Sequence, residues 1–252
     1  MLALTREISS AINRCELTHV AREPVDLPAA RTQHREYERA LEALGCTVRR
    51  LAADDTMPDS VFIEDTAVVL AEVAIMSRPG AASRRHEVDG VAAALGRLRS
   101  LVRIEPPGTL DGGDVLVVGR SIFVGRSSRT NAAGIEQFQG AVAPLGYSVR
   151  LLTPSNCLHL KSAATALDER TVLVNPRWIS REYFNDLDCL TIDGSEPGAA
   201  NVVSVHGRLI AAAAYPKTCR RLRDRGFDVQ QVDASELSKA EGALTCCSLL
   251  VP

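Results

Sequence analysis

The chain has no long apolar run, almost no net charge and few aromatic residues, and each lack excludes a class of protein. With 29 lysines and arginines against 31 aspartates and glutamates, the net charge is −2 at neutral pH. We therefore expect no general attraction to nucleic acid or to an anionic membrane surface. The most apolar window, residues 66–76, is interrupted by Glu72 and is much shorter than a membrane-spanning helix.

The cysteines also lack a paired pattern. Seven cysteines are scattered along the chain without a CxxC pair. The N-terminal residues MLALTREISSAINR contain charged side chains early and show no apolar stretch of a secretory signal. These features argue against a disulfide framework or a zinc ribbon. We expect reduced thiols and a soluble, cytoplasmic protein.

The overall composition is that of an ordinary globular protein. Of the 252 residues, 46% are apolar and 24% are charged, which excludes a disordered chain. Aromatic residues make up only 4%, so the core must consist mainly of Ala, Val, Leu and Ile. No linker-like or low-complexity segment interrupts the chain. The sequence therefore predicts a single domain over residues 1–252.

A loose internal repeat recurs about every 50 residues, which favours a repeat architecture. Each copy is a short apolar run followed by a turn with a basic residue: Leu2–Arg6, Ala74–Arg78, Ile122–Arg126, Val172–Arg177 and Leu209–Lys217. Other strand-like runs cover residues 46–51, 61–70, 115–118, 147–152 and 227–232. Helices are predicted at about 27–44, 84–100, 130–145, 180–186 and 215–225. Alternating strands and helices predict an α/β fold.

Acidic residues occur at two places where an apolar strand would normally exclude them. Glu64 and Asp65 interrupt the strand-like run 61–70. Because an unpaired buried carboxylate is costly, they indicate either a solvated loop or a strand end that holds a cation. The segment Asp111-Gly-Gly-Asp114 reads as an ordinary turn before a strand, with Asp114 fixing that turn. Alternatively, its glycines let the backbone approach a ligand that the acids face.

Two further positions could supply a nucleophile and its proton partner. His159 lies in an apolar segment, where a lone histidine is more often structural. Cys246 and Cys247 are adjacent, so at most one of them can face a given cleft if they lie on a strand. Cysteine is also commonly a small buried apolar residue. Taken with the acids, however, these residues match a thiolate nucleophile with a histidine partner and carboxylates that orient it.

The charged residues also suggest a substrate. Several carboxylates suit a planar cation, because carboxylate and guanidinium pair through two hydrogen bonds. Arg84 and Arg129, both in turns, would grip a carboxylate at the other end, although both could equally be surface residues. A molecule with a guanidinium at one end and a carboxylate at the other is an arginine derivative.

With these residues in place, the chain resembles the dimethylarginine dimethylaminohydrolases, members of the guanidino-group-modifying pentein superfamily. The resemblance covers about residues 4–251 and rests on motifs in the family's order: LPAARTQHREYERAL, MPDSVFIEDTAVV, SRPGAASRRHEV, TLDGGDVL, GRSSRTN, LHLKS and EGALTCCSLLV. It implies a pentein, a five-bladed α/β propeller of ββαβ-type repeats around a pseudo-fivefold axis.

The resemblance also implies a role for each matched residue. The nucleophile matches Cys246, the acid–base histidine matches His159 and its carboxylate partner matches Asp111. The remaining matches are all substrate contacts: Glu64 and Asp65 for the guanidinium, Asp59 with the carbonyls of Leu17 and Ala240 for the α-amino group, and Arg84 and Arg129 for the carboxylate. The chain departs from relatives at Ala240, which replaces a larger apolar residue, and it matches poorly near residues 13–23.

The implied reaction converts methylated arginines to citrulline and a methylamine through a covalent cysteine adduct, without metal or organic cofactor. Arginine deimination is the nearest alternative, since it also gives citrulline, but deiminases typically carry an inserted helical domain. The fold also hosts a non-enzymatic ribosome-associated factor, which would need no cysteine, histidine and acid set. Zinc captured by Cys246 and His159 would inhibit the reaction. The sequence is compatible with a homo-oligomer but shows no interface.

Overall fold

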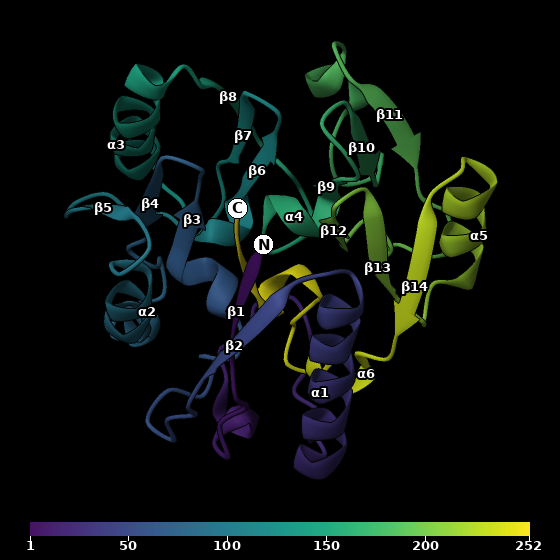
Figure 1. The fold of residues 1–252 in the computed structure, drawn as a ribbon, viewed down its shortest axis with the longest axis horizontal. Coiled ribbons are helices and arrows are strands. Elements are labelled where there is room, and N and C mark those ends of the chain that lie inside the picture. The colour runs from purple at the N-terminus through teal and green to yellow at the C-terminus, as the bar shows by residue number, and fades with distance from the viewer.

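The computed structural model describes all residues from Met1 to Pro252. Its strands form five separate three-stranded sheets, which we call blades, arranged as a ring with helices on the outside (Figure 1). The blades in strand order are β15-β1-β2, β3-β4-β5, β6-β7-β8, β9-β10-β11 and β12-β13-β14. The pentein fold predicted from the sequence is therefore confirmed.

In every blade the middle strand pairs antiparallel with the inner strand and parallel with the outer strand. The middle strands are β1 (Leu2–Arg6), β4 (Val73–Met76), β7 (Ser121–Gly125), β10 (Thr171–Val174) and β13 (Arg208–Ala212). The inner strands are β15 (Leu249–Val251), β3 (Ala67–Val69), β6 (Val115–Val118), β9 (Ala164–Ala166) and β12 (Val202–Val205). The outer strands are β2 (Thr47–Leu51), β5 (Ser100–Arg103), β8 (Ser148–Leu152), β11 (Asp188–Thr191) and β14 (Asp228–Val232).

A parallel pair needs a crossover connection, and in each blade the crossover between middle and outer strand carries a helix. These crossovers contain α1 (Leu27–Ala43), α2 (Glu87–Leu95), α3 (Ala132–Val142) with η5 (Ala143–Leu145), η6 (Arg181–Phe184) and α5 (Pro216–Asp224). The fourth blade has only the one-turn η6 at this place, where the sequence predicted a helix over 180–186. Further short helices are η1 (Ile12–Arg14), η3 (Ala82–Arg84) and α6 (Ser235–Ser238).

The internal repeat seen in the sequence marks the middle strands. Each of the five apolar runs falls on the middle strand of a different blade, where side chains are buried on both faces. The residues of the outer strands β2 and β8 are mostly exposed or half-buried, so the apolar pattern in their sequence is weaker. A strand covered on both faces has a nearly continuous apolar sequence, which explains why this part of the repeat was readable.

Two predicted element boundaries are wrong. Residues 61–70 do not form one strand, because Ile63–Thr66 form the 3₁₀ turn η2 and strand β3 begins only at Ala67. A regular strand would point the adjacent side chains of Glu64 and Asp65 to opposite faces. The turn instead lets both buried acids reach polar partners. The helix predicted over 84–100 ends at Leu95, and the outer strand β5 starts at Ser100.

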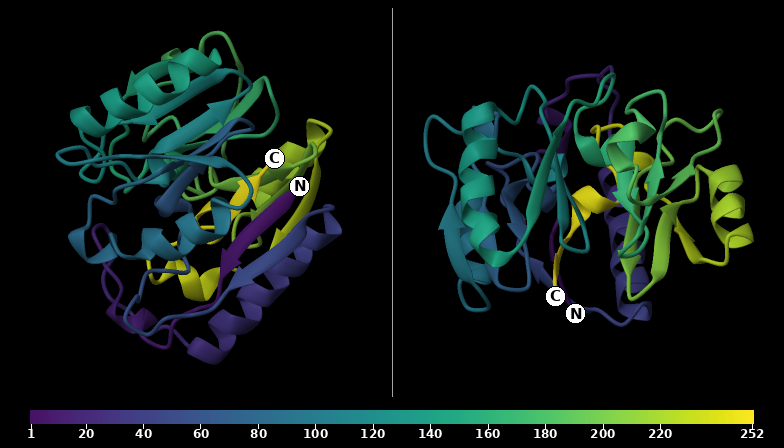
Figure 2. Two further views of the ribbon diagram at one scale, coloured as in Figure 1. Left: turned by 60° about the vertical axis from the view of Figure 1, so that its left-hand side comes forward. Right: turned by 90° about the horizontal axis from the view of Figure 1, so that it is seen from above.

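The ring is closed by its chain ends. The inner strand β15 pairs with β1, with Leu2 opposite Val251 and Leu4 opposite Leu249. Both ends therefore lie side by side near the axis of the ring (Figures 1 and 2). No helix in the structure is both long and apolar enough to cross a membrane.

Candidate active site

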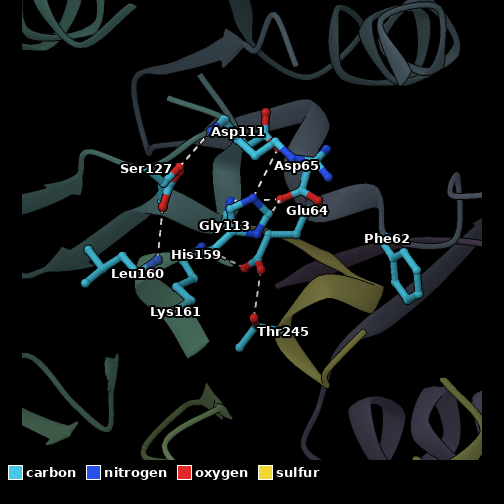
Figure 3. Close-up of polar contacts among 12 residues, drawn as sticks. Phe62, Glu64, Asp65, Asp111, Gly113, Ser127, His159, Leu160, Lys161 and Thr245 are labelled. Atoms are coloured by element: carbon cyan, nitrogen blue, oxygen red, sulfur yellow. Dashed lines mark hydrogen bonds and ion pairs between the residues drawn. The ribbon is translucent and has the colours of Figure 1, made fainter. Parts of the chain in front are cut away.

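Short turns that precede the inner strands carry or directly adjoin half of the ten predicted site residues. We call them the inner turns: η2 (Ile63–Thr66), η4 (Gly112–Asp114), α4 (Leu160–Ala163), the turn 197–201 and η7 (Thr245–Cys247). Neighbouring turns contact one another, η2 with η7 and η4, and η4 with α4. Motifs that lie far apart in the sequence thus meet near the centre of the ring (Figure 3).

A pocket beside these turns contains seven of the ten predicted site residues: Asp59, Asp65, Arg84, Arg129, His159, Ala240 and Cys246. The other three lie outside its lining. Asp111 lies behind His159, Glu64 lies beneath the pocket, and Leu17 packs against the core around helix α1. The sequence did not indicate Glu16, Ser162 and Glu241, which also line the pocket.

His159 is held by carboxylates on several sides. Its Nε2 lies 3.1 Å from Asp111 Oδ2 and its Nδ1 lies 3.7 Å from Asp65 Oδ1. Burial opposes a charge on the ring, yet Asp65, Asp114 and Asp111 raise the pKa of His159 to about 10. The histidine is therefore an imidazolium at neutral pH, with a proton on each ring nitrogen. It is equipped to give a proton to a leaving group.

Asp114 fixes the turn that carries the histidine, whereas the sequence predicted that it fixes its own turn before strand β6. Its Oδ1 accepts the backbone N–H of Leu160 at 3.0 Å, and its Oδ2 accepts the hydroxyl of Ser127 at 2.5 Å. Ser127 in turn accepts the backbone N–H of Arg129 at 3.0 Å. Burial raises the pKa of Asp114 to about 6. One carboxylate thus connects the His159 turn with the loop of Arg129.

The two glycines of the Asp-Gly-Gly-Asp motif allow close packing inside the protein rather than against a ligand. A Cβ at Gly112 would lie 2.0 Å from the carbonyl oxygen of Glu64. A Cβ at Gly113 would lie 2.6 Å from Nδ1 of His159. The backbone of Gly113 also donates to Asp65 Oδ1 at 3.1 Å. Only glycine lets these inner turns approach so closely.

Asp65 and Arg84 form a buried pair. Arg84 Nη1 lies 2.6 Å from Asp65 Oδ2, and Nη2 lies 2.9 Å from Glu87 Oε2 and 3.0 Å from the carbonyl of Phe62. Despite burial, His159 and Arg84 lower the pKa of Asp65, which stays ionised. The guanidinium of Arg84 is largely committed to these partners, so a substrate carboxylate would meet mainly the second hydrogen of Nη1.

Only one of the adjacent cysteines lines the pocket. Cys246 is partly exposed and lines it, whereas Cys247 is buried and its Sγ lies 3.4 Å from the carbonyl of Ala243. Burial and the carboxylates of Glu64 and Asp65 raise the pKa of the Cys246 thiol. The thiol is therefore neutral in the free protein, and a cation placed beside it would favour the thiolate.

Glu64 is placed differently from its expected contact with a guanidinium. Its Oε1 lies 2.7 Å from Lys161 Nζ and its Oε2 accepts the hydroxyl of Thr245 at 2.7 Å (Figure 3). These three residues also line a second cavity, a channel along the inner strands on the other side. Both carboxylate oxygens of Glu64 therefore have hydrogen-bond partners. Glu64 lines the channel and not the pocket, and we call its position beneath the pocket the floor.

A cover segment, residues 13–25, contributes Glu16 to the pocket and is fixed by acidic side chains. Asp59 accepts the backbone N–H of Glu16 with both oxygens, at 3.1 and 3.3 Å. Glu241 accepts the backbone N–H groups of Thr18 and His19 at 2.6 and 2.8 Å. Arg129 Nη2 donates to the Thr18 hydroxyl at 3.2 Å. Glu241 begins the motif EGALTCCSLLV, but the motif gave it no role, because that role depends on a contact more than 200 residues away along the chain.

The group of side chains with metal-ligand geometry is Asp65, Asp111 and His159, whose ligand atoms lie within 4.8 Å of one another. Cys246 does not belong to this group, so zinc bound by Cys246 and His159 stays a prediction. Each of the three residues already has a hydrogen-bond partner, and Asp65 pairs with Arg84. This arrangement serves to hold a proton on His159.

Comparison with known proteins identifies the relatives. The family model "N,N dimethylarginine dimethylhydrolase, eukaryotic" matches residues 5–186. A Streptomyces coelicolor protein named N(G),N(G)-dimethylarginine dimethylaminohydrolase is 44% identical over 252 residues, covering 98% of this chain and 95% of that protein. The Pseudomonas aeruginosa protein of the same name is 35% identical over 226 residues, covering 89% of each.

Solved structures agree with the sequence comparison. A cysteine-to-serine mutant of the Pseudomonas aeruginosa enzyme complexed with citrulline has a TM-score of 0.94 and 33% identity, covering 98% of this chain and 97% of that one. A dimethylarginine dimethylaminohydrolase adduct with S-methyl-L-thiocitrulline gives the same TM-score and identity, covering 98% of both chains. The N-terminal domain of the arginine dihydrolase ArgZ, at 18% identity and a TM-score of 0.88, shares the fold.

Proposed function

The chain belongs to the dimethylarginine dimethylaminohydrolase family, and on that premise we propose that it hydrolyses Nω-methylated arginines to citrulline and a methylamine. The observation that carries this proposal is a histidine held in its charged form by carboxylates in the same pocket as a partly exposed cysteine. Relatives of this name, and one solved with citrulline, support the substrate class. The whole chain, 1–252, acts as one catalytic unit.

Substrate binding uses both ends of the pocket. The guanidinium lies against the ionised carboxylate of Asp65, with Glu64 contributing negative charge from the floor. The substrate carboxylate is held by Arg129, whose Nη2 exchanges the Thr18 hydroxyl for it, and by the remaining Nη1 hydrogen of Arg84. The α-amino group is held by Asp59 and by the carbonyls of Leu17 and Ala240. Binding therefore positions the guanidinium carbon over Cys246.

The reaction begins when the bound cation lowers the pKa of Cys246, whose proton leaves to solvent. The thiolate attacks the guanidinium carbon and forms a tetrahedral adduct. His159 gives its proton to the methylated nitrogen, the C–N bond breaks and the methylamine leaves. A thiouronium bound to Cys246 remains. His159, now neutral, takes one proton from water, whose oxygen attacks the same carbon. The remaining hydroxyl proton of this adduct passes to sulfur as the C–S bond breaks, so citrulline leaves and Cys246 returns to its thiol.

Citrulline release from asymmetric dimethylarginine, monomethylarginine and arginine, each offered separately, tests the proposal. We expect turnover of the methylated substrates and little of arginine. Cys246→Ser should abolish turnover while the protein stays folded, and the matched variant Cys247→Ser should retain most of it. The opposite result for the two cysteines would reverse the choice of nucleophile. Strong arginine turnover would move the chain to the deiminases.

Other properties belong to the same proposal. We propose that the enzyme works in the cytoplasm. We also propose that it needs no bound cofactor, because His159, Cys246 and water account for every proton transfer in the scheme. Zinc held by Cys246 and His159 would compete with the substrate cation and inhibit. The mechanism is compatible with a homo-oligomer and requires no residue from a second copy.

A further inference from the structure

One of the five inner turns has no part in the reaction above. The turn 197–201 precedes the inner strand β12 and ends in Asn201, whose side chain is buried. We propose that Asn201 is a positioning residue that holds the cysteine turn η7 and the histidine turn α4 at a fixed separation. The inference rests on the proposed function and adds to it a residue that neither the motifs nor the pocket lining indicated.

The amide of Asn201 joins two turns directly. Its Oδ1 accepts the backbone N–H of Thr245, the residue before Cys246, at 3.0 Å. Its Nδ2 donates to the Thr245 hydroxyl at 2.9 Å and to the carbonyl of Lys161, two residues after His159, at 3.1 Å. An asparagine side chain has two donor hydrogens and one acceptor oxygen, so one residue supplies all of these contacts.

These hydrogen bonds are part of a closed hydrogen-bond cycle. The Thr245 hydroxyl donates to Glu64 Oε2, and Lys161 Nζ donates to Glu64 Oε1, each at 2.7 Å. The backbone carbonyl of Lys161 accepts from Asn201 and closes the cycle. The cycle joins the turns that carry Asp65, His159 and Cys246, because each of those residues lies within two positions of one of its members.

Side-chain bridges matter here because no strand of one blade pairs with a strand of another, and the isolated β-bridge between Arg78 and Leu110 lies outside the strands. Each blade is a separate sheet, and Cys246, His159 and Asp65 precede the inner strands of three different blades. Their relative positions depend on packing and on bridges between the turns. A displacement of the nucleophile by about 1 Å can lower the rate about 100-fold, because the reacting atoms no longer align.

The test compares Asn201→Ala with Thr218→Val. Thr218 is also buried, and its Oγ1 accepts the backbone N–H of Asp193 at 3.0 Å, away from the pocket. We expect Asn201→Ala to lower kcat for the methylated substrate about 10- to 100-fold with KM changed less than about threefold. Thr218→Val should lower thermal stability and leave kcat unchanged.

Hydrogen exchange gives a readout that does not depend on turnover. Asn201→Ala should accelerate amide exchange at Thr245, Cys246 and Cys247, whereas Thr218→Val should not. The double variant Asn201→Ala with Thr245→Val should lose no more kcat than the worse single variant, since both substitutions break the same hydrogen-bond cycle. If Asn201→Ala does not fold, Asn201→Asp keeps the acceptor for Thr245 and removes both donors, and the same loss of kcat is expected.

The outcomes separate the two proposals. An unmodified protein that releases no citrulline overturns the proposed function, while faster exchange at η7 in Asn201→Ala would still support the tether. An active protein whose Asn201→Ala variant keeps kcat, or loses it together with an equal rise in KM, overturns the positioning role. So does a kcat loss of the same size in Thr218→Val, which would mark a general loss of stability.

Discussion

Individual charges in the pocket are set by what surrounds each residue. Asp59 is the clearest case, because burial, against the attraction of Arg84, raises its pKa to about 6. Its neighbour in the pocket, Asp65, is also buried but stays ionised because His159 and Arg84 lower its pKa. One acid is therefore poised to titrate near neutral pH, and the other is not.

This difference predicts a pH-dependent KM. An α-ammonium group binds ionised Asp59, so KM for the methylated substrate should rise as pH falls through about 6, by up to tenfold for each pH unit below that value. Steady-state kinetics between about pH 5 and 8 measure this. Asp59→Asn should show a high KM that no longer depends on pH in that range.

The control for this prediction is Asp55→Asn. Asp55 also accepts a backbone N–H, that of Ser10 at 2.9 Å, but it does not line the pocket. Its variant should keep the pH profile of the unmodified protein. A flat KM across pH 6 in the unmodified protein would show that Asp59 does not bind the substrate cation.

Residues of the site differ in how well the sequence could indicate them. Cys246, His159 and Asp111 lie in short motifs that were read locally, and all three lie at the pocket or directly behind it. Asn201 and Glu241 act through neighbours 40 or more residues away, so no local pattern marks them. The contact of Glu64 with Lys161 could not be predicted either, because two different blades supply the partners.

At the scale of elements, the turns rather than the strands carry the chemistry. The sequence placed the five middle strands well, since their burial on both faces leaves a continuous apolar pattern. It misjudged residues 61–70, where the acids terminate the apolar run in a 3₁₀ turn. Tertiary partners stabilise that turn, and local propensity alone does not predict it.

The cover segment, residues 13–25, supplies a prediction at this scale. Glu241 fixes it through two backbone N–H groups and has a positive φ of 60°, which asparagine also tolerates. Glu241→Asn should therefore keep the local backbone and weaken the latch. We expect amide exchange at Thr18 and His19 to accelerate at least about tenfold, because hydrogen bonds to a charged acceptor are lost.

Kinetics distinguish a latch from a general structural effect. Glu241→Asn should raise KM more than it lowers kcat, since the cover segment holds the substrate and does not take part in proton transfer. Glu241→Gln, which keeps the length of the acceptor without its charge, should have an intermediate effect. Unchanged exchange at Thr18 and His19 in Glu241→Asn would contradict the latch.

At the scale of the whole molecule, the ring of blades is closed although the polypeptide has two ends. Strands β15 and β1 complete one blade from opposite ends of the sequence, and Cys246 precedes β15 by only two residues. The repeat in the sequence predicted five equivalent units but not that one of them is shared between the chain ends. That sharing is visible only in the pairing register.

A circular permutant tests whether the covalent ends matter. A short glycine-rich linker would join Pro252 to Met1, and new ends would open between His206 and Gly207 in the hairpin of β12 and β13. Since the blade contacts are retained, we expect the same circular dichroism spectrum and citrulline release within about tenfold of the unpermuted chain. A folded permutant without activity would show that the natural opening is needed to place Cys246.

The pairing of Leu2 with Val251 also concerns how the protein reaches its native state. Contacts between residues so distant in sequence carry a large loop-closure entropy and slow the folding of a chain. Four blades can form from contiguous segments, whereas the blade that immobilises the nucleophile turn must wait for the two most distant strands to meet. In a refolding experiment, recovery of activity should therefore coincide with the slowest structural phase, after most secondary structure has returned.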